Sequence, residues 1–273
     1  MTEAVAAASL GEAVRDATAK LAAAGVDSPR LDAELLLAWA LGVDRSRLVI
    51  DALDPLPADA GGRFEHALAR RVAREPVAYI LGFKDFRHIS LAVDPRVLIP
   101  RPETELLVDV ALSLPAGARV ADVGTGSGAV ALALSSERPD LRVVGIDVSE
   151  DAVALARGNG SRLGLDVEFV VGDLLAGGRY DAVLANLPYI ATGASLAPEI
   201  ARYEPAGALF GGADGLDVIR RLALVLGDIP FVALEIGFDQ SAAVTSLLRD
   251  AGLKSVWTER DLAGHERVAV GRR

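Results

Sequence analysis

Cysteine is absent from the 273-residue sequence. Disulfide bonds, thiolate metal sites and cysteine nucleophiles are therefore excluded. No apolar run approaches the roughly 20 residues that a membrane-spanning helix needs. The apolar N-terminal stretch is not typical of a signal peptide, because Glu3 stands where positive charge is expected and Glu12 interrupts the stretch. We assign this stretch to the start of a helix, and we expect a cytoplasmic protein that does not associate with membranes.

Positive charge is in short supply. There are 28 Lys and Arg residues against 38 Asp and Glu residues, which gives a net charge of −10. This balance argues against a protein whose main activity is binding bare nucleic acid. An apolar fraction of 51% with 24% charged residues is typical of a globular protein and excludes a disordered chain. We expect one large domain, or one domain with a small appendage.

Apolar residues recur at helical spacing from residue 10 to about residue 73. The three apolar stripes are Leu10, Ala13, Val14, Ala17 and Leu21; Leu31, Leu35, Ala38 and Leu41; and Phe64, Leu68 and Val72. Gly25 and Gly42 follow the first two stripes as helix stops, and Pro29 and Pro57 precede the next helical segments. Because no strand pattern appears here, the sequence predicts a small helical domain.

A cluster of arginines lies in the third helical segment. Its members are Arg63, Arg70, Arg71 and Arg74. They fall opposite the apolar stripe of that segment, so we expect them to form a solvated helix face rather than a docking patch.

The remaining sequence alternates between short apolar strands and helices. Residues 82–97 have the rough alternation of a β-hairpin. The predicted strands lie near residues 119–123, 142–146, 167–171, 180–185, 230–236 and 266–271. Strands that are apolar on both faces and separated by helices predict a mainly parallel α/β sheet covered on both sides.

A glycine-rich loop follows the first of these strands, and a helix begins directly after it. The loop residues are Gly124, Thr125, Gly126, Ser127 and Gly128. Residues without Cβ allow the tight turn and let backbone N–H groups approach a ligand at the helix N-terminus. Asp147, at the end of the next strand, can accept both hydroxyls of a ribose. The pattern predicts a pocket for an adenosine-type ligand, and a nicotinamide cofactor also satisfies it.

The strand at residues 180–185 ends in the tetrapeptide Asn186-Leu187-Pro188-Tyr189. The carboxyl ends of neighbouring parallel strands share one crevice, so we expect the tetrapeptide to face the glycine loop. The Asn186 amide and the Leu187 backbone carbonyl suit a planar amide or amino group. Pro188 stiffens the turn, and Tyr189 offers a flat face to a planar substrate group.

This combination resembles the class I S-adenosylmethionine-dependent methyltransferases, whose amino-group members carry [DNS]-P-P-[YFW] at this place. The stretch LIPRPETELLV, residues 98–108, is similar to a narrower group, the release-factor glutamine methyltransferases. Those enzymes methylate N5 of the glutamine in the GGQ tripeptide of peptide-chain release factors. The likeness covers nearly the whole chain and includes the segments YEP at 203–205, GGADGL at 211–216, EIG at 235–237 and DLAGHER at 261–267.

The resemblance implies a Rossmann-like class I methyltransferase sheet with a small N-terminal helical domain, joined by a β-hairpin linker. We expect residues 1–81 to form a helical substrate-recognition domain, 82–97 the linker and 98–273 the methyltransferase domain. It implies S-adenosyl-L-methionine as the cofactor and peptide-chain release factors as the protein partner. It also implies that Arg101 and Glu103 shape the mouth of the pocket.

For the cofactor, the resemblance implies that the glycine loop holds the methionine part and that Asp147 holds the ribose. It places Asp173 and Leu174 beside the adenine. There Asp173 could accept a hydrogen bond from the exocyclic amine, although a plain surface turn would account for it as well. Asn186 also borders the cofactor, and we expect no metal ion.

For the substrate, the resemblance implies that Asn186 Oδ1 and the Leu187 carbonyl accept the two N–H bonds of the glutamine amide. They would stabilise the positive charge that grows on the nitrogen in the transition state. Pro188 and Tyr189 would clamp the plane of the amide.

One position departs from the family pattern. The family tetrapeptide is NPPY, whereas Leu187 stands at its second position here. Leucine keeps the backbone carbonyl but not the rigidity of a second proline. NLPY also resembles the tetrapeptide of ribosomal RNA adenine N6-dimethyltransferases, so an RNA or DNA adenine N6-methyltransferase is the alternative. Those enzymes lack the RPETE segment and usually have a basic surface, and the release-factor interpretation is therefore favoured.

Overall fold

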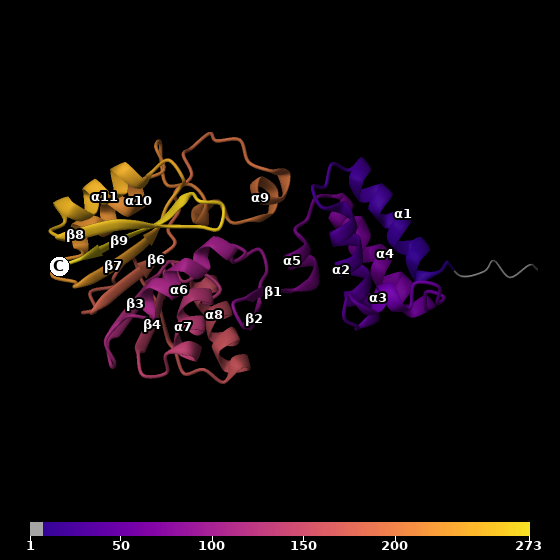
Figure 1. Ribbon diagram of the computed structural model, residues 1–273, viewed down its shortest axis with the longest axis horizontal. Helices are drawn as coiled ribbons and strands as arrows, with labels where there is room; N and C mark the ends of the chain where they lie inside the picture. Colours follow the sequence, from indigo (N-terminus) through magenta and orange to yellow (C-terminus); the bar gives the residue numbers. More distant parts are fainter. Residues whose placement is uncertain (1–7) are drawn as a thin grey trace, which may run out of the picture. The chain divides into compact units, whose positions relative to one another are not determined.

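The computed structural model describes residues 8–273, and its chain divides into two compact units (Figure 1). The first unit ends at Gly82 and also contains Ala197–Tyr203. The second contains Phe83–Leu196 and Glu204–Arg273. The first seven residues of the apolar N-terminal stretch, Glu3 included, lie outside the described part. Within residues 8–273, no helix is both long enough and apolar enough to cross a membrane.

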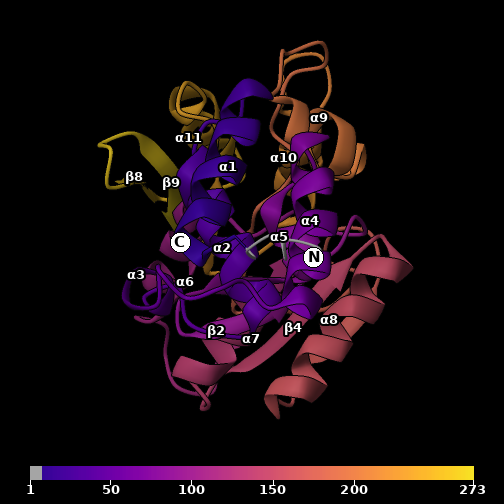
Figure 2. The same ribbon diagram turned by 90° about the vertical axis from the view of Figure 1, so that its right-hand side faces the viewer.

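The first unit is helical, as predicted. Its helices are α1 (Leu10–Ala23), α2 (Pro29–Leu41), α3 (Arg47–Ile50), α4 (Ala58–Val72), α5 (Val77–Leu81) and α9 (Pro198–Tyr203). Ser9 and Glu12 form a reciprocal capping box at the start of α1, and Gly42 ends α2 in the left-handed conformation. Helices α1, α2 and α4 pack against one another (Figure 2). The core between them includes Leu21, Leu36 and Phe64.

Two residues of the predicted apolar stripes are exposed to solvent. Leu31 is 41% exposed and Val72 is 39% exposed, so the prediction is wrong at both positions. In α2 the buried face is carried by Ala33, Leu36 and Leu37 instead. The spacing rule fails here because the run LLLAWAL is apolar at consecutive positions and therefore offers more than one apolar stripe.

The arginine cluster is a solvated face only in part. Arg63 is exposed, as predicted, whereas Arg71 and Arg74, the latter just beyond the end of α4, are held in ion pairs. The Arg71 side chain is only 7% exposed, and its Nε donates to Asp32 Oδ2 at 2.7 Å while Nη2 donates to Glu199 Oε1 at 2.9 Å. Arg74 Nη2 donates to Glu199 Oε2 at 2.7 Å. Burial tends to raise the pKa of Glu199, but the hydrogen bonds from Arg74 and Arg71 outweigh it and lower that pKa to about 2. Sequence periodicity could not predict this ion network, because Glu199 lies 128 residues beyond Arg71.

The second unit is built on a seven-stranded sheet in the order β5-β4-β3-β6-β7-β9-β8. The strands are β3 (Arg119–Val123), β4 (Arg142–Asp147), β5 (Glu168–Val171), β6 (Ala182–Ala185), β7 (Phe231–Glu235), β8 (Ser255–Arg260) and β9 (Glu266–Arg272). All neighbours are parallel except β9, which runs antiparallel to both β7 and β8. The predicted α/β class is confirmed. Strand β8 was not predicted, because it is a half-exposed edge strand with a polar sequence.

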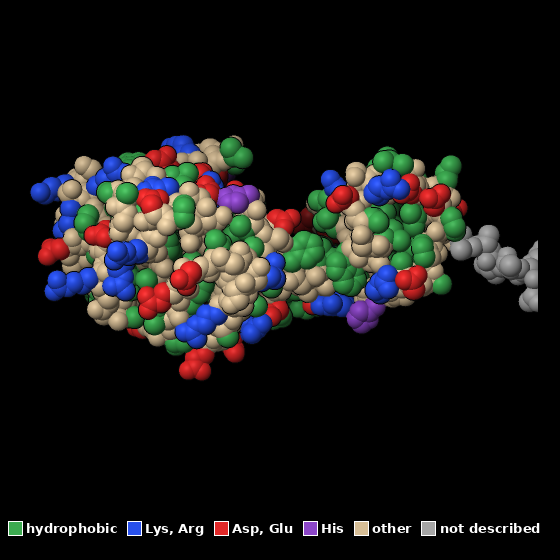
Figure 3. Space-filling model, turned by 90° about the horizontal axis from the view of Figure 1, so that it is seen from below, with side chains coloured by type: hydrophobic (Ala, Val, Ile, Leu, Met, Phe, Trp, Pro, Cys, Tyr) green, Lys and Arg blue, Asp and Glu red, His purple; other side chains and the backbone are tan. Residues whose placement is uncertain are grey.

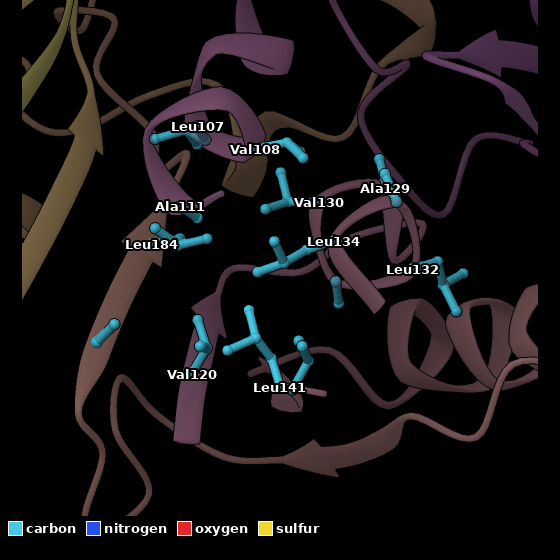
Figure 4. Close-up of a cluster of buried hydrophobic side chains, with 14 of the residues drawn as sticks. Leu107, Val108, Ala111, Val120, Ala129, Val130, Leu132, Leu134, Leu141 and Leu184 are labelled. Carbon is cyan, nitrogen blue, oxygen red and sulfur yellow. The ribbon is translucent and has the colours of Figure 1, made fainter. Parts of the chain in front are cut away.

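Helices cover both faces of the sheet. They are α6 (Glu105–Ala111), α7 (Ala129–Glu137), α8 (Glu150–Leu163), α10 (Asp217–Val225) and α11 (Ser241–Asp250), with 3₁₀ turns η1 (Pro102–Thr104) and η2 (Ala206–Ala208). Side chains of α6, α7 and α8 pack with β3 and β6 in one buried cluster (Figure 4). Those of α10 and α11 belong to a second cluster, which contains the residues that face the other way on the strands. An antiparallel hairpin of β1 (Phe83–Phe86) and β2 (Ile89–Ala92) precedes the sheet.

The register of the central strands brings the expected site together. Val123 of β3 pairs with Ile146 of β4 on one side and with Ala185 of β6 on the other. The three strands therefore end side by side, and the residues that follow them meet at one edge of the sheet.

We expect Arg71→Ala to destabilise the first unit by about 3 kcal/mol, because it removes the guanidinium that pairs with the buried carboxylate of Asp32 and one of the two that pair with Glu199. Lys20→Ala is the matched control. It removes an ion pair at 3.7 Å in which both side chains are more than half exposed, and it should cost less than about 0.5 kcal/mol. Urea unfolding, together with hydrogen exchange of the α2 and α4 amides, measures both effects. Equal losses for the two variants would contradict the assignment.

Candidate active site

The glycine loop connects β3 to α7 and approaches the tetrapeptide closely. Gly124 has a φ of +73°, and a Cβ built there would lie 3.3 Å from Leu187 Cδ2 and 3.4 Å from Asn186 O. The backbone N–H groups of Gly124 and Thr125 both donate to Ile146 O, at 2.8 and 3.0 Å. Glycine is required at residue 124 by conformation and by this close approach.

Asp147 ends β4 beside the loop. Its Oδ2 accepts a hydrogen bond from Gly126 N at 2.9 Å, and its Oδ1 accepts one from Ser149 N at 3.0 Å. An ionised carboxylate offers about four lone-pair positions. Each oxygen of Asp147 can therefore still accept from a ligand hydroxyl while the backbone bonds fix the orientation of the carboxylate.

Asp122 is a buried site residue that the sequence analysis did not select. Its Oδ2 accepts from Thr125 Oγ1 at 2.6 Å and from Ala131 N at 3.2 Å, so it braces both the loop and the first turn of α7. Burial raises the pKa of this carboxyl to about 6, against the lowering effect of those hydrogen bonds. A signal was present in the sequence, because a charged residue interrupts the apolar strand RVADV directly before the glycine loop.

A cavity of about 420 Å³ opens at this edge of the sheet, within the size range of small-molecule sites. The predicted site residues that line it are Gly124, Thr125, Gly126, Ser127, Asp147, Asp173, Leu174, Asn186, Leu187 and Pro188. In the described part of the chain, four other predicted residues stand outside this lining. They are Gly128, which caps α7, and Arg101, Glu103 and Tyr189.

Asp173 is engaged by another side chain. Arg221 of α10 forms an ion pair with it, and both side chains are more than half exposed. Leu174 follows with a φ of +51° and lines the cavity. The role of Asp173 toward an adenine stays a prediction, and the guanidinium of Arg221 competes for the same carboxylate.

The Leu187 side chain is part of the core. It is buried in the second cluster of apolar residues and contacts the glycine loop at Gly124. The position that departs from the family tetrapeptide therefore has a packing role, and leucine leaves the backbone carbonyl in place.

A hydrogen-bonded group of side chains lies behind the tetrapeptide. Asn186 Nδ2 donates to Thr104 Oγ1 at 3.1 Å, and Thr104 Oγ1 donates to Glu235 Oε2 at 2.6 Å. The Tyr189 hydroxyl donates to Glu235 Oε1 at 3.2 Å. Burial raises the pKa of the Glu235 carboxyl to about 7, and burial together with the neighbouring Glu235 raises the pKa of Tyr189. Thr104 and Glu235 both lie inside segments that resemble the family, 98–108 and 235–237, but no role was predicted for either.

Arg101 is held by a carboxylate from a distant segment. It forms an ion pair with Glu204, whose side chain is only 1% exposed and whose Oε2 also accepts from Ile99 N at 3.4 Å. Glu103 lies one turn away, in η1. The structure thus gives Arg101 a fixed partner that the sequence did not identify.

Comparisons with known proteins identify the family of the chain. Residues 12–82 match the PrmC N-terminal domain family, and residues 102–203 match the methyltransferase small domain family. The release factor glutamine methyltransferase of Mycolicibacterium smegmatis is 42% identical over 279 residues, covering 97% of this chain and 98% of the relative. The protein of the same name from Caulobacter vibrioides is 42% identical over 266 residues, covering 92% of each chain.

Solved structures share the fold. The chain resembles the catalytic domain of hMettl16, solved with an RNA hairpin, with a TM-score of 0.54, 17% identity and coverage of 76% of this chain and 81% of that chain. A methyltransferase from Pyrococcus furiosus gives a TM-score of 0.51, 18% identity and coverage of 76% and 96%. These likenesses confirm the class I methyltransferase sheet that the sequence predicts.

We expect Asp147→Ala to weaken S-adenosylmethionine binding about 10- to 100-fold, the range of a lost hydrogen bond to a charged group. Asp173→Ala is the comparison, and its effect should be smaller because Arg221 already occupies that carboxylate. Calorimetric titration measures both dissociation constants. An unchanged affinity for the Asp147 variant would remove this residue from the binding site.

Proposed function

Because this chain belongs to the release factor glutamine methyltransferase family, we propose that it methylates N5 of the glutamine in the GGQ sequence of peptide-chain release factors. The methyl donor is S-adenosylmethionine. The observation that carries the proposal is the place of Asn186: it lies at the edge of the cavity beside the glycine loop, with its Nδ2 bound to Thr104. Its carbonyl oxygen is then the free end of the side-chain amide.

The residues present fit the cofactor. The glycine loop provides a tight turn with glycine at residues 124, 126 and 128, before the N-terminus of α7, where anionic groups are favoured. Asp147 keeps lone pairs for ribose hydroxyls, and the cavity volume suits a ligand of this size. When bound, S-adenosylmethionine supplies a methyl group already activated by the sulfonium. The work left to the protein is positioning and electrostatics.

The substrate amide is a weak nucleophile, because its nitrogen lone pair is delocalised into the carbonyl. We assign Asn186 Oδ1 and the Leu187 carbonyl as the acceptors of its two N–H bonds. Two acceptors fix the plane of the amide and stabilise the positive charge that develops on the nitrogen. Tyr189 and Pro188 would hold the same plane from its faces. No strong base is required, since the methylated, positively charged nitrogen is acidic and releases its proton to water.

The alternative suggested by the tetrapeptide is a nucleic-acid adenine methyltransferase. The relatives reported above are named release factor glutamine methyltransferases, which does not favour this alternative. The chain carries a net charge of −10, and acidic and basic side chains are interspersed on the face seen in Figure 3. A protein substrate fits this surface better than a polyanion does.

Mass spectrometry of a bacterial release factor incubated with the enzyme and S-adenosylmethionine tests the proposal. We expect one added methyl group on the GGQ glutamine and no transfer to RNA in a parallel reaction. Transfer to RNA but not to the release factor would reverse the assignment.

Asn186→Ala should lower methyl transfer by about 100-fold or more, the scale of losing one preorganised hydrogen bond to the transition state. The affinity for S-adenosylmethionine should change little. Leu187→Ala is the matched control, because it trims a buried side chain but keeps the backbone carbonyl. We expect turnover of this control within about 10-fold of wild type, measured by radiolabelled methyl transfer. Similar losses for both variants would show that packing, not the amide oxygen, limits the reaction.

A further inference from the structure

The side chains behind the tetrapeptide come from separate segments of the second unit. Thr104 ends η1, Glu235 ends β7, and Asn186 and Tyr189 follow β6. Glu235 is 1% exposed and Thr104 is 4% exposed, so both lie out of contact with bulk water. We assign no substrate contact to Glu235 itself, yet it accepts hydrogen bonds from Tyr189 of the tetrapeptide and from Thr104, which in turn holds Asn186.

We propose that Glu235 is a positioning residue: through Thr104 it determines which end of the Asn186 amide faces the cavity. The inference rests on the proposed function, in which Asn186 Oδ1 receives an N–H of the substrate. In this proposal the buried Glu235 carboxylate makes the site specific for a substrate group that donates an N–H bond.

The direction of the hydrogen bonds follows from counting protons. A carboxylate can only accept, so the single hydroxyl proton of Thr104 is directed to Glu235 Oε2. Thr104 Oγ1 then has only lone pairs to offer to Asn186. The Asn186 group that meets it must be the N–H donor Nδ2, and Oδ1 is left as an acceptor.

The second oxygen of the same carboxylate fixes Tyr189. Glu235 Oε1 accepts the Tyr189 hydroxyl at 3.2 Å, and Gln240 Nε2 donates to the Tyr189 carbonyl at 2.9 Å. One carboxylate therefore orients both the acceptor amide and the aromatic ring that we expect to clamp the substrate plane.

Charged groups from other elements shift the pKa values of Glu235 and Tyr189. Glu103 of η1 raises the pKa of Glu235 and Arg267 of β9 lowers it, while Arg101 and Arg267 both lower the pKa of Tyr189. Burial is the largest effect and brings the pKa of Glu235 to about 7. Once protonated, Glu235 can donate to Thr104, which frees the Thr104 proton and removes the constraint on the Asn186 amide.

The first test compares Glu235→Gln with Thr104→Val, Thr104→Ser and the double variant Glu235→Gln/Thr104→Val. We expect kcat to fall about 10-fold or more in each of the first two, with the dissociation constant of S-adenosylmethionine within about threefold of wild type. The serine variant keeps the hydroxyl and should retain most of kcat. The double variant should be no slower than the slower single variant, because both substitutions interrupt the same hydrogen-bonded chain from Glu235 through Thr104 to Asn186.

Folding stability separates positioning from a structural role. The pKa of Glu235 lies above the ordinary carboxyl value, so the folded state loses stability as pH rises through about 7. Glu235→Gln removes that charge and should be at least as stable as wild type at pH 8, although it is slower. A variant that loses kcat and stability together, or one that keeps wild-type kcat, would overturn the proposal.

A readout without substrate keeps this inference distinct from the proposed function. In NMR spectra the Asn186 side-chain NH₂ signal, assigned by its loss in Asn186→Ala, should shift with a midpoint near pH 7 in wild type and stay constant in Glu235→Gln. Wild-type enzyme that shows this shift but does not methylate a release factor would refute the proposed function alone. A signal that is constant with pH in wild type would refute the role of Glu235.

Discussion

The in-register parallel pairing of β3 with β4 and β6 is the constraint on which the site depends. It ends three strands at one level, so that the glycine loop, Asp147 and the NLPY tetrapeptide meet although they are separated along the chain. A slip of one residue in either pairing would turn the buried side chains of a strand to the opposite face. Apolar clusters on both sides of the sheet oppose such a slip, and the precision of the site is therefore a consequence of core packing.

The sequence predicted those parts of the molecule that are encoded locally. The glycine loop, the acid at the end of the next strand and the tetrapeptide are each contiguous, and the helices and apolar strands follow simple periods. Thr104 and Glu235 received no role because their partners are distant in the sequence: Thr104 meets Asn186 82 residues away and Glu235 131 residues away. The burial of Arg71 escaped prediction for the same reason. Asp122 was overlooked although its partners, Thr125 and Ala131, are only 3 and 9 residues away. The edge strand β8 escaped because its sequence is polar and half exposed.

Carboxylates in the two units have pKa values shifted in opposite directions. Glu199 is surrounded by guanidinium groups, and its pKa falls to about 2, which favours the folded state at neutral pH. Asp122 and Glu235 sit at the site with raised pKa values of about 6 and 7, so that their charges weaken the fold near neutrality. A loss of folding stability of this kind is typical of ionisable residues at functional sites, where they orient other groups.

The ion network of Glu199 has a consequence for the order in which the protein is made. Arg71 and Arg74 leave the ribosome long before Glu199, which follows Arg71 by 128 residues. N-terminal domains generally begin to fold during synthesis. The helices before Gly82 are therefore made while Arg71 and Arg74 still lack their ion pairs with Glu199. Completion of the first unit depends on a segment that appears only after β6 and the NLPY tetrapeptide have been translated. The first unit therefore reaches its full set of ion pairs only when strands β3 to β6 of the second unit have already been synthesised.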